Sequence, residues 1–329
     1  MQQVDAAVVG AGPNGLAAAI TLAQAGISVR VYEAADDIGG SARTEELTLP
    51  GFQHDVCAAV HPLGAGSPFL RTLPLEQHGL RWIQPPVGMA HPLDDGPPIT
   101  LARSLAETAD SLGLDGQRYR SLVRPFVRHW NELAADALRP ISSTLPRHPL
   151  LFARFGMRGL PPVAVLAAMM PGSRGAAMLA GLAAHAIAPV TALSTGGVAT
   201  LFAVAGHAVG WPISGGGTQA VSDALAAQLR SLGGEIVTGT RVASVHEVQP
   251  ARAVLLDLAP WNIPRIAGDA LPASYSRRLQ TVRHGPAAFK LDYALREPVP
   301  WRDEACRRAG TVHVGGTYAE VAYALHTVV

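Results

Sequence analysis

An α/β fold is predicted by three features of this 329-residue sequence. The run "VDAAVVG" (4–10) is a short apolar segment broken by glycine, which is typical of a buried parallel strand. A helix pattern follows at once, and a second strand pattern, "ISVRVYE" (27–33), follows the helix. Glycines, a helix pattern and strand patterns return at residues 213–260, after a long helical region. These features predict a Rossmann-like domain that is interrupted by an inserted α+β domain.

The composition excludes several classes of protein. Charged residues make up 16% of the chain and the net charge is +1, with no basic run, so we expect no nucleic-acid partner. The two cysteines, Cys57 and Cys306, form neither a ligand cluster nor a disulfide framework. This predicts no metal site and a reducing, cytoplasmic compartment. A strand pattern begins already at Val4, so we expect no signal peptide.

The first strand leads into a turn with the spacing G-x-G-x-x-G. Gly10 would allow the tight turn, Gly12 would let the backbone approach a pyrophosphate, and Gly15 would let helix and strand pack closely. The helix that begins near Pro13 and Asn14 would turn its free N–H groups and positive dipole end toward the phosphates. The turn therefore predicts a dinucleotide site, and the alternative is a glycine-rich turn without a ligand.

The helix and the second strand complete this unit. The helix "NGLAAAITLAQA" ends at Gly26, as expected just past a helix C-terminus. The second strand ends at Glu33, 23 residues after Gly10, and Ala34 follows it. A carboxylate at Glu33 would accept hydrogen bonds from both hydroxyls of the adenosine ribose and would repel a 2′-phosphate.

NAD and FAD both use such a unit, and the next segment favours FAD. "DDIGGSART" carries Gly39 and Gly40, then Arg43 and Thr44, and a guanidinium fork suits a phosphate. The segment resembles the second glycine motif of flavoproteins in the FAD-dependent amine oxidase and phytoene desaturase superfamily, where it also touches the FAD pyrophosphate. The closer resemblance, shared by "LPGFQHDVCAAVHPLG" (49–64), is to the phytoene dehydrogenase-related branch, which is pyridine nucleotide-disulphide oxidoreductase domain 2-like. An NAD-dependent dehydrogenase remains the alternative.

The middle of the chain predicts helices. "SLAETADSL" and "GQRYRSLVRPFVRHWNELAADAL" are amphipathic patterns, and this region resembles the inserted substrate domain of the superfamily. No Asp, Glu, Lys or Arg occurs from Gly175 to Ser222. This stretch is too interrupted for a membrane span, so we expect a buried helical layer, with a substrate-tunnel wall or a peripheral membrane-contact patch as the functional alternatives. Its histidines, His185 and His207, are expected to be core groups.

The later part of the chain returns to the nucleotide domain. "EIVTGTRVASV" (235–245) predicts strands, and in the superfamily a valine of this strand pair contacts the adenine, which implies the same for Val242. "ARAVLLDLAP" (251–260) predicts the next strand. The expected FAD-binding domain therefore comprises residues 1–66 and 206–268, and the substrate domain comprises residues 67–205 and 269–329.

Lys290 is the chain's one lysine and the candidate catalytic residue. "GPAAFKLDYALREPVPW" (285–301) alternates like a strand and resembles the amine oxidase strand whose lysine holds a water beside flavin N5. An ammonium there would stabilise negative charge on the reduced flavin or activate oxygen. The alternative is a solvent-facing pair of Lys290 and Asp292.

The resemblance implies an FAD-dependent oxidoreductase that removes hydride from a small apolar or amine-like substrate. Members of the superfamily continue into a glycine-rich C-terminal segment at the flavin ring, and no such motif follows Trp301. Either a second chain, as a homo-oligomer or as a separate partner, supplies that part, or the chain is a truncation product, or it folds as a reduced variant. The alternative functions are a truncated, non-catalytic FAD- or ADP-binding protein that acts by association and an NAD-dependent dehydrogenase.

Overall fold

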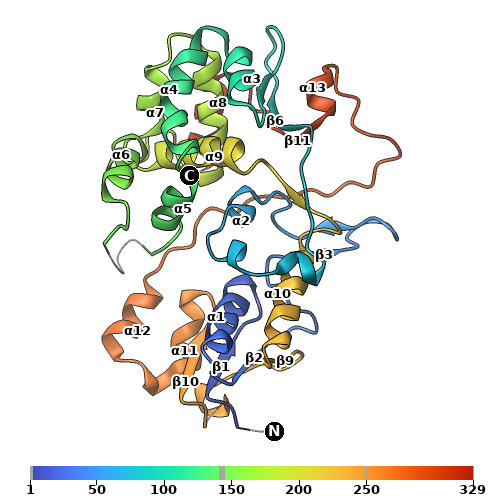
Figure 1. The fold of residues 1–329 in the computed structure, drawn as a ribbon, viewed down its shortest axis with the longest axis vertical. Coiled ribbons are helices and arrows are strands. Elements are labelled where there is room, and N and C mark those ends of the chain that lie inside the picture. Colours follow the sequence, from blue (N-terminus) through green and yellow to red (C-terminus); the bar gives the residue numbers. More distant parts are fainter. Residues whose placement is uncertain (1–2, 141–144, 249, 329) are drawn as a thin grey trace.

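The computed structural model describes residues 3–140, 145–248 and 250–328. Figure 1 shows a parallel sheet with its helices at one end of the molecule and a mainly helical part at the other. Segments from the two ends of the sequence meet in each part, because the chain crosses between them more than once (Figure 1). The predicted α/β fold is confirmed; the domain boundaries stay a prediction.

The nucleotide-domain sheet has the strand order β10-β1-β2-β9, and every neighbouring pair is parallel. Its central strands are short and buried on both faces, as expected for a parallel sheet. Strand β1 is apolar throughout, and the one charged residue of β2, Arg30, pairs through Nε with the Glu235 carboxylate of β9 over 2.6 Å. Helix α1 connects β1 to β2 and packs beside α10. The elements are β1 (Ala6–Val9), α1 (Pro13–Gln24), β2 (Val29–Tyr32), α10 (Gln219–Ser231), β9 (Glu235–Val237) and β10 (Ala253–Leu256).

Sequence explains where α1 begins and ends. Gly12 is its N-cap and Pro13 is its first residue, a position where the missing N–H of proline costs no helical hydrogen bond. Leu16 and Ile20 are fully buried between α1 and the sheet. The chain leaves the helix at Gly26, whose φ of +79° is unfavourable for other residues.

The inserted part combines a helical bundle with a small sheet. The sheet has the order β11-β6-β7, in which β11 is parallel to β6 and comes from the end of the chain. The largest hydrophobic core lies between this sheet and α4, α8 and α9. The elements are β6 (Val87–His91), β7 (Ile99–Leu101), α3 (Leu105–Ser111), α4 (Gly116–Val127), α5 (Trp130–Ala137), α6 (Pro149–Gly159), α7 (Val163–Ala168), α8 (Arg174–Ala183), α9 (Thr195–Ala208), β11 (Ala309–Val312) and α14 (Tyr318–Val328).

Shorter elements join the two parts or flank them. They are β3 (Thr44–Glu45), β4 (His54–Asp55), α2 (Pro62–Ala65), β5 (Trp82–Ile83), β8 (Ile213–Ser214), α11 (Ile263–Ala267), α12 (Ala273–Gln280) and α13 (Glu304–Arg307). Strand β3 pairs with β4, and β5 pairs with β8, both antiparallel. These ribbons lie between the sheet end and the helical end in Figure 1.

Two local predictions were wrong. The long helix expected over 116–138 is divided into α4 and α5, with Pro125 inside the last turn of α4. Proline lacks the N–H that would bond to the Ser121 carbonyl, which weakens this last turn, and the chain leaves helical geometry at His129, whose φ and ψ are −119° and +37°. The strand expected over 285–301 is also absent: this described segment is irregular and mostly exposed, without a neighbouring strand to complete its hydrogen bonds.

The uncharged stretch forms a buried layer, as expected. Helix α8 is buried along nearly its whole length, and α9 packs against it. His207 is a core group, as predicted, at 5% exposure. His185 is not, because its side chain is exposed and stacks on Phe202 with ring centroids 4.7 Å apart. None of the helices in the described ranges is long and apolar enough to cross a bilayer.

The buried imidazole of His207 predicts acid sensitivity. Tyr119 donates to its Nε2 over 2.8 Å, and its Nδ1 lies 3.4 Å from the Arg103 carbonyl, so the neutral tautomer is satisfied. Burial lowers the pKa of His207 to about 4. The unfolded chain binds a proton near pH 6.5 and the folded chain only near pH 4, so folding stability must fall as the pH drops through this window. The part of this loss that comes from His207 should be about 3 kcal/mol, measured by urea unfolding at pH 7.0 and pH 4.5 as the difference between wild type and a variant without this imidazole.

The matched variants are His207→Gln and His246→Gln, since His246 is an exposed histidine that pairs with Asp269. The pH slope should become smaller in His207→Gln and stay unchanged in His246→Gln. Equal slopes in wild type and His207→Gln would contradict the assignment.

Candidate dinucleotide site

A cavity of about 340 Å³ lies where β1, β2 and β10 end and α1 begins. In open α/β sheets, ligands bind beyond the carboxyl ends of the strands, and this cavity has that position. Segments from three distant parts of the sequence meet around it, including the segment after β9 and helix α11. The predicted residues that line it are Gly10, Gly12, Pro13, Asn14, Glu33, Ala34, Gly40 and Val242.

The glycines of the turn are required by their surroundings. Gly10 has a φ of +107°, and a Cβ there would lie 2.4 Å from the Asp257 carbonyl oxygen. A Cβ at Gly15 would lie 2.1 Å from the Gly10 carbonyl oxygen, so the helix packs directly on the turn. Within the described ranges, the N–H groups of Gly12 and Asn14 have no hydrogen-bond partner. Unpaired donors at a helix N-terminus suit an anion such as a pyrophosphate.

The Glu33 carboxylate is held at the edge of the cavity by backbone donors. The Ala11 N–H donates to its Oε2 and the Ala35 N–H to its Oε1, each over 2.9 Å. A carboxylate oxygen accepts more than one hydrogen bond, so these contacts orient the group and leave acceptor capacity for ribose hydroxyls.

The second glycine motif packs on the first. The Gly39 N–H donates to the Ala11 carbonyl over 2.9 Å, and a Cβ at Gly40 would lie 3.3 Å from the Gly12 Cα. Both residues have positive φ, +117° for Gly39 and +56° for Gly40. The motif therefore brings a second stretch of backbone to the part of the cavity where a pyrophosphate would lie.

The structure does not bring the other motif residues to the cavity wall. Gly15 and Gly39 do not line the cavity. The Gly15 N–H donates to the Asp257 carboxylate, and the Gly39 N–H donates to the Ala11 carbonyl. The Arg43 guanidinium pairs with Glu45, with Nε and Oε1 3.3 Å apart. The Thr44 hydroxyl donates to the Asp55 carboxylate over 2.6 Å. A direct cofactor contact for these residues stays a prediction.

Val242 lines the cavity, although the strand pair expected around it is incomplete. Only β9 forms, and the chain then turns at Gly239, which has a φ of +63°. The Thr240 N–H donates to the Glu33 carbonyl over 2.8 Å, which fixes the following residues beside the end of β2. Hydrogen bonding to β2 thus carries Val242 to the cavity without a regular strand.

Sequence reasoning missed several polar residues of the cavity. Asp257 follows β10 directly, and its Oδ2 accepts from the Gly15 N–H over 2.7 Å. Asp257 therefore links the end of β10 to the start of α1. Arg241 and Arg265 also line the cavity and bring positive charge to it. The signal for Asp257 was available, since a charged residue directly after the apolar run "AVLL" marks the end of a parallel strand.

Lys290 lies on the irregular segment and not on the cavity wall. Its ammonium pairs with the Asp292 carboxylate, which also lies 3.6 Å from Nδ1 of His54 on β4. The pairing matches the alternative that the sequence left open, and a catalytic role for Lys290 stays a prediction. Among the described residues, no group of three or more His, Cys, Asp or Glu side chains could hold a metal ion.

One family model covers the part of the chain that contains both glycine motifs. Residues 8–73 match the family model of the NAD(P)-binding Rossmann-like domain. The chain is 30% identical over 146 residues to a limonene dehydrogenase polypeptide of Castellaniella defragrans, an alignment that covers 44% of this chain and 26% of that protein. It is 36% identical over 128 residues to pyridine nucleotide-disulfide oxidoreductase domain-containing protein 2 of Mus musculus, which covers 38% of this chain and 21% of that protein.

Solved structures extend the similarity to the fold. An oxidoreductase from Methanosarcina mazei matches with a TM-score of 0.56 at 20% identity, over 85% of this chain and 65% of that one. Putrescine oxidase bound to putrescine matches with a TM-score of 0.52 at 21% identity, over 85% of this chain and 63% of that one. Residues 8–73 thus match the NAD(P)-binding Rossmann-like domain, and the chain resembles pyridine nucleotide-disulfide oxidoreductase domain-containing protein 2 in sequence and putrescine oxidase in fold.

Proposed function

We propose that the chain binds FAD and functions in an FAD-dependent oxidoreductase. One observation carries the choice of FAD: the second glycine motif packs on the first, with Gly40 against Gly12 at the cavity. The NAD alternative needs only the first motif. Two glycine-rich segments at one pyrophosphate position are what the resemblance to flavoproteins implies.

The residues present fit the ADP half of FAD. Glu33 would accept hydrogen bonds from the ribose hydroxyls. The unpaired N–H groups of Gly12 and Asn14 would bind the pyrophosphate, and the nearby guanidinium of Arg265 would offset its charge. Val242 would contact the adenine. When bound, FAD supplies hydride acceptance, and the protein supplies binding and orientation.

A small apolar or amine-like compound is the proposed substrate class. Limonene dehydrogenase is named for an apolar terpene and putrescine oxidase for an amine. The alignments cover 21–26% of the curated relatives, and the chain spans 63–65% of the solved structures. The activity and substrate of the whole enzyme are therefore proposals, as is the role of Lys290 in reoxidation of the flavin.

Reconstitution with FAD tests the proposal. The purified chain, incubated with FAD and desalted, should retain flavin absorption bands, and ADP should compete while 2′,5′-ADP should not. Glu33→Gln should weaken FAD binding about tenfold, because it replaces charge-assisted hydrogen bonds to the ribose. Glu297→Gln, on an exposed segment away from the cavity, is the control.

Each result separates the candidate functions. A chain that retains FAD and is bleached anaerobically by a terpene or an amine supports the oxidoreductase. Flavin binding without bleaching favours the non-catalytic binding protein. A chain that binds NAD but no flavin would overturn the choice of FAD.

A further inference from the structure

A second, different cavity lies in the helical part of the molecule. It has a volume of about 190 Å³ and lies between α4, α6 and α7. Its apolar wall includes Met157, Leu166, Met169 and Met170, and the guanidinium-bearing side chains of Arg118 and Arg158 also line it. These helices lie at the opposite end of the molecule from the dinucleotide cavity in Figure 1. The site therefore takes no part in dinucleotide binding.

The arginines at this cavity have no acidic partner. In the described part of the chain, no carboxylate forms an ion pair with Arg118, Arg154 or Arg158. Burial lowers the pKa of Arg158, and the like charges of Arg154 and Arg118 lower it further, so the three guanidinium groups repel one another. Nη1 of Arg158 is buried and lacks a hydrogen-bond partner. Such a cluster is relieved when an anion binds.

A further cavity beside this one also combines arginines with apolar side chains. A neighbouring hollow of about 540 Å³ between α4 and α6 is lined by Arg124, Arg128 and Arg154 together with Leu150 and Leu151. No Asp or Glu occurs anywhere from Ala137 to Ser222. Two acids lie near these helices: Glu132 faces His129, with 3.4 Å between Oε1 and Nδ1, and Asp110 lies 3.9 Å from Nη2 of Arg120 on α4. Among the described residues, the arginines that line these two cavities form no ion pair with a carboxylate, so the face carries an excess of positive charge.

Large apolar side chains are exposed on this same face. Leu150 at the start of α6 is 87% exposed, Met157 near its end is 72% exposed, and Leu160 directly after it is 65% exposed. Exposed apolar side chains interleaved with arginines are typical of helices that lie in the interface of an anionic membrane. We call the face formed by α6, α7 and the exposed side of α4 the arginine–methionine face.

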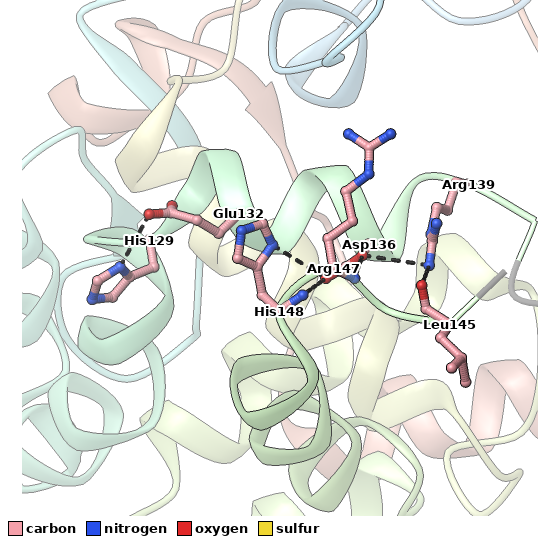
Figure 2. A network of polar contacts seen from close by, with 7 residues as sticks. All are labelled: His129, Glu132, Asp136, Arg139, Leu145, Arg147 and His148. Atoms are coloured by element: carbon pink, nitrogen blue, oxygen red, sulfur yellow. Dashed lines mark hydrogen bonds and ion pairs between the residues drawn. The ribbon is translucent and has the colours of Figure 1, made fainter.

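The start of α6 is fixed by a buried acid. The N–H groups of Arg147 and His148 each donate to the Asp136 carboxylate over 2.8 Å (Figure 2). Helix α6 therefore begins at a defined position relative to α5.

We propose that the arginine–methionine face docks on a bilayer that contains anionic phospholipid, and that the 190 Å³ cavity receives one lipid, with its phosphate at Arg118 and Arg158 and the start of its alkyl chain among the methionines. Methionine side chains adapt to flexible apolar groups, and arginine binds phosphate in a bidentate manner. An acidic protein would match the charge but would leave the exposed leucines without an apolar partner. The bilayer satisfies both features, and this inference does not depend on the proposed function.

Vesicle co-sedimentation tests the proposal with the full chain. Vesicles of phosphatidylcholine with phosphatidylglycerol should bind the protein, and vesicles of phosphatidylcholine alone should bind it much more weakly. Arg118→Gln and Arg158→Gln should each lower the partition coefficient about fivefold. Met157→Ser should lower it as well, through lost apolar contact. Arg277→Gln on the distant helix α12 is the matched control and should leave binding unchanged.

Two further measurements keep the test decisive. Because Arg158 packs over the Phe126 ring, with Cζ 5.2 Å from the centroid, circular dichroism must show that its variant is folded. If it is not, the exposed Arg154→Gln replaces it. The proposal is overturned if wild type does not bind the anionic vesicles, if it binds polyglutamate but not vesicles, or if Arg277→Gln lowers binding as much as the cavity variants.

Discussion

Replacing Gly15 with valine is expected to abolish dinucleotide binding and to destabilise the nucleotide domain. A Cβ at this position would lie 2.1 Å from the Gly10 carbonyl oxygen and 3.0 Å from Oδ2 of Asp257. Both contacts are shorter than van der Waals separation, and the first is with backbone, so α1 must move away from the turn. The movement displaces the N–H groups that would bind the pyrophosphate.

The stability cost follows from the same geometry. Overpacking of a tight contact costs about 1–3 kcal/mol, and the Gly15 hydrogen bond to Asp257 would be lost in addition. FAD retained after desalting measures binding, and urea unfolding measures stability. We expect no retained FAD and an unfolding free energy lower by about 3 kcal/mol.

Gly156→Ala is the control for this variant. Gly156 lies within α6, and a Cβ there would have no neighbour within 4 Å. Alanine should stabilise the helix by about 0.5–1 kcal/mol and leave FAD binding unchanged. Normal FAD binding by Gly15→Val would show that the close approach at the turn is not needed.

The sequence predicted the turn well because the rules that govern it are local. Gly10, Gly12 and Gly15 lie within six residues, and the helix that follows them is specified by its own pattern and by Gly26. Glu33 was predictable as the acidic residue at the end of the second strand pattern, and in the structure it directly follows β2. The conformation that each of these residues allows depends on backbone within a few positions of it in the sequence.

The parts that sequence could not predict depend on distant contacts. Asp257 bonds to Gly15 across 242 positions, and nothing in either local pattern names the other. The cluster of Arg118 and Arg158 is likewise formed only when α4 and α6 pack together. The segment around Lys290 shows the opposite error, since alternation alone predicted a strand where no partner strand is present to pair with it.

Replacing Asp136 with alanine is expected to cause the largest loss of stability in the helical part. The carboxylate is buried and accepts from two backbone N–H groups, those of Arg147 and His148. It also lies 3.5 Å from Arg139 Nη2 and 3.3 Å from His148 Nδ1 (Figure 2). Removing this buried carboxylate leaves the N–H groups of Arg147 and His148 without their acceptor and removes the charge that faces Arg139, which costs about 3–5 kcal/mol.

The pH dependence gives this prediction its sharpest test. Burial alone would raise the pKa of Asp136, but the N–H groups of Arg147 and His148 and the Arg139 guanidinium hold it below its ordinary value. A carboxyl whose pKa is lower in the folded state stabilises the fold above the unfolded pKa, and this contribution is lost as the pH falls below about 4. The difference in unfolding free energy between wild type and Asp136→Ala should therefore be largest at pH 7 and should shrink toward pH 2.5.

Asp110→Ala is the control, because it removes an exposed carboxylate 3.9 Å from Arg120. It should change the free energy of unfolding by less than about 0.5 kcal/mol at either pH. A loss for Asp136→Ala that does not change with pH would show that packing, rather than the charge, holds the start of α6.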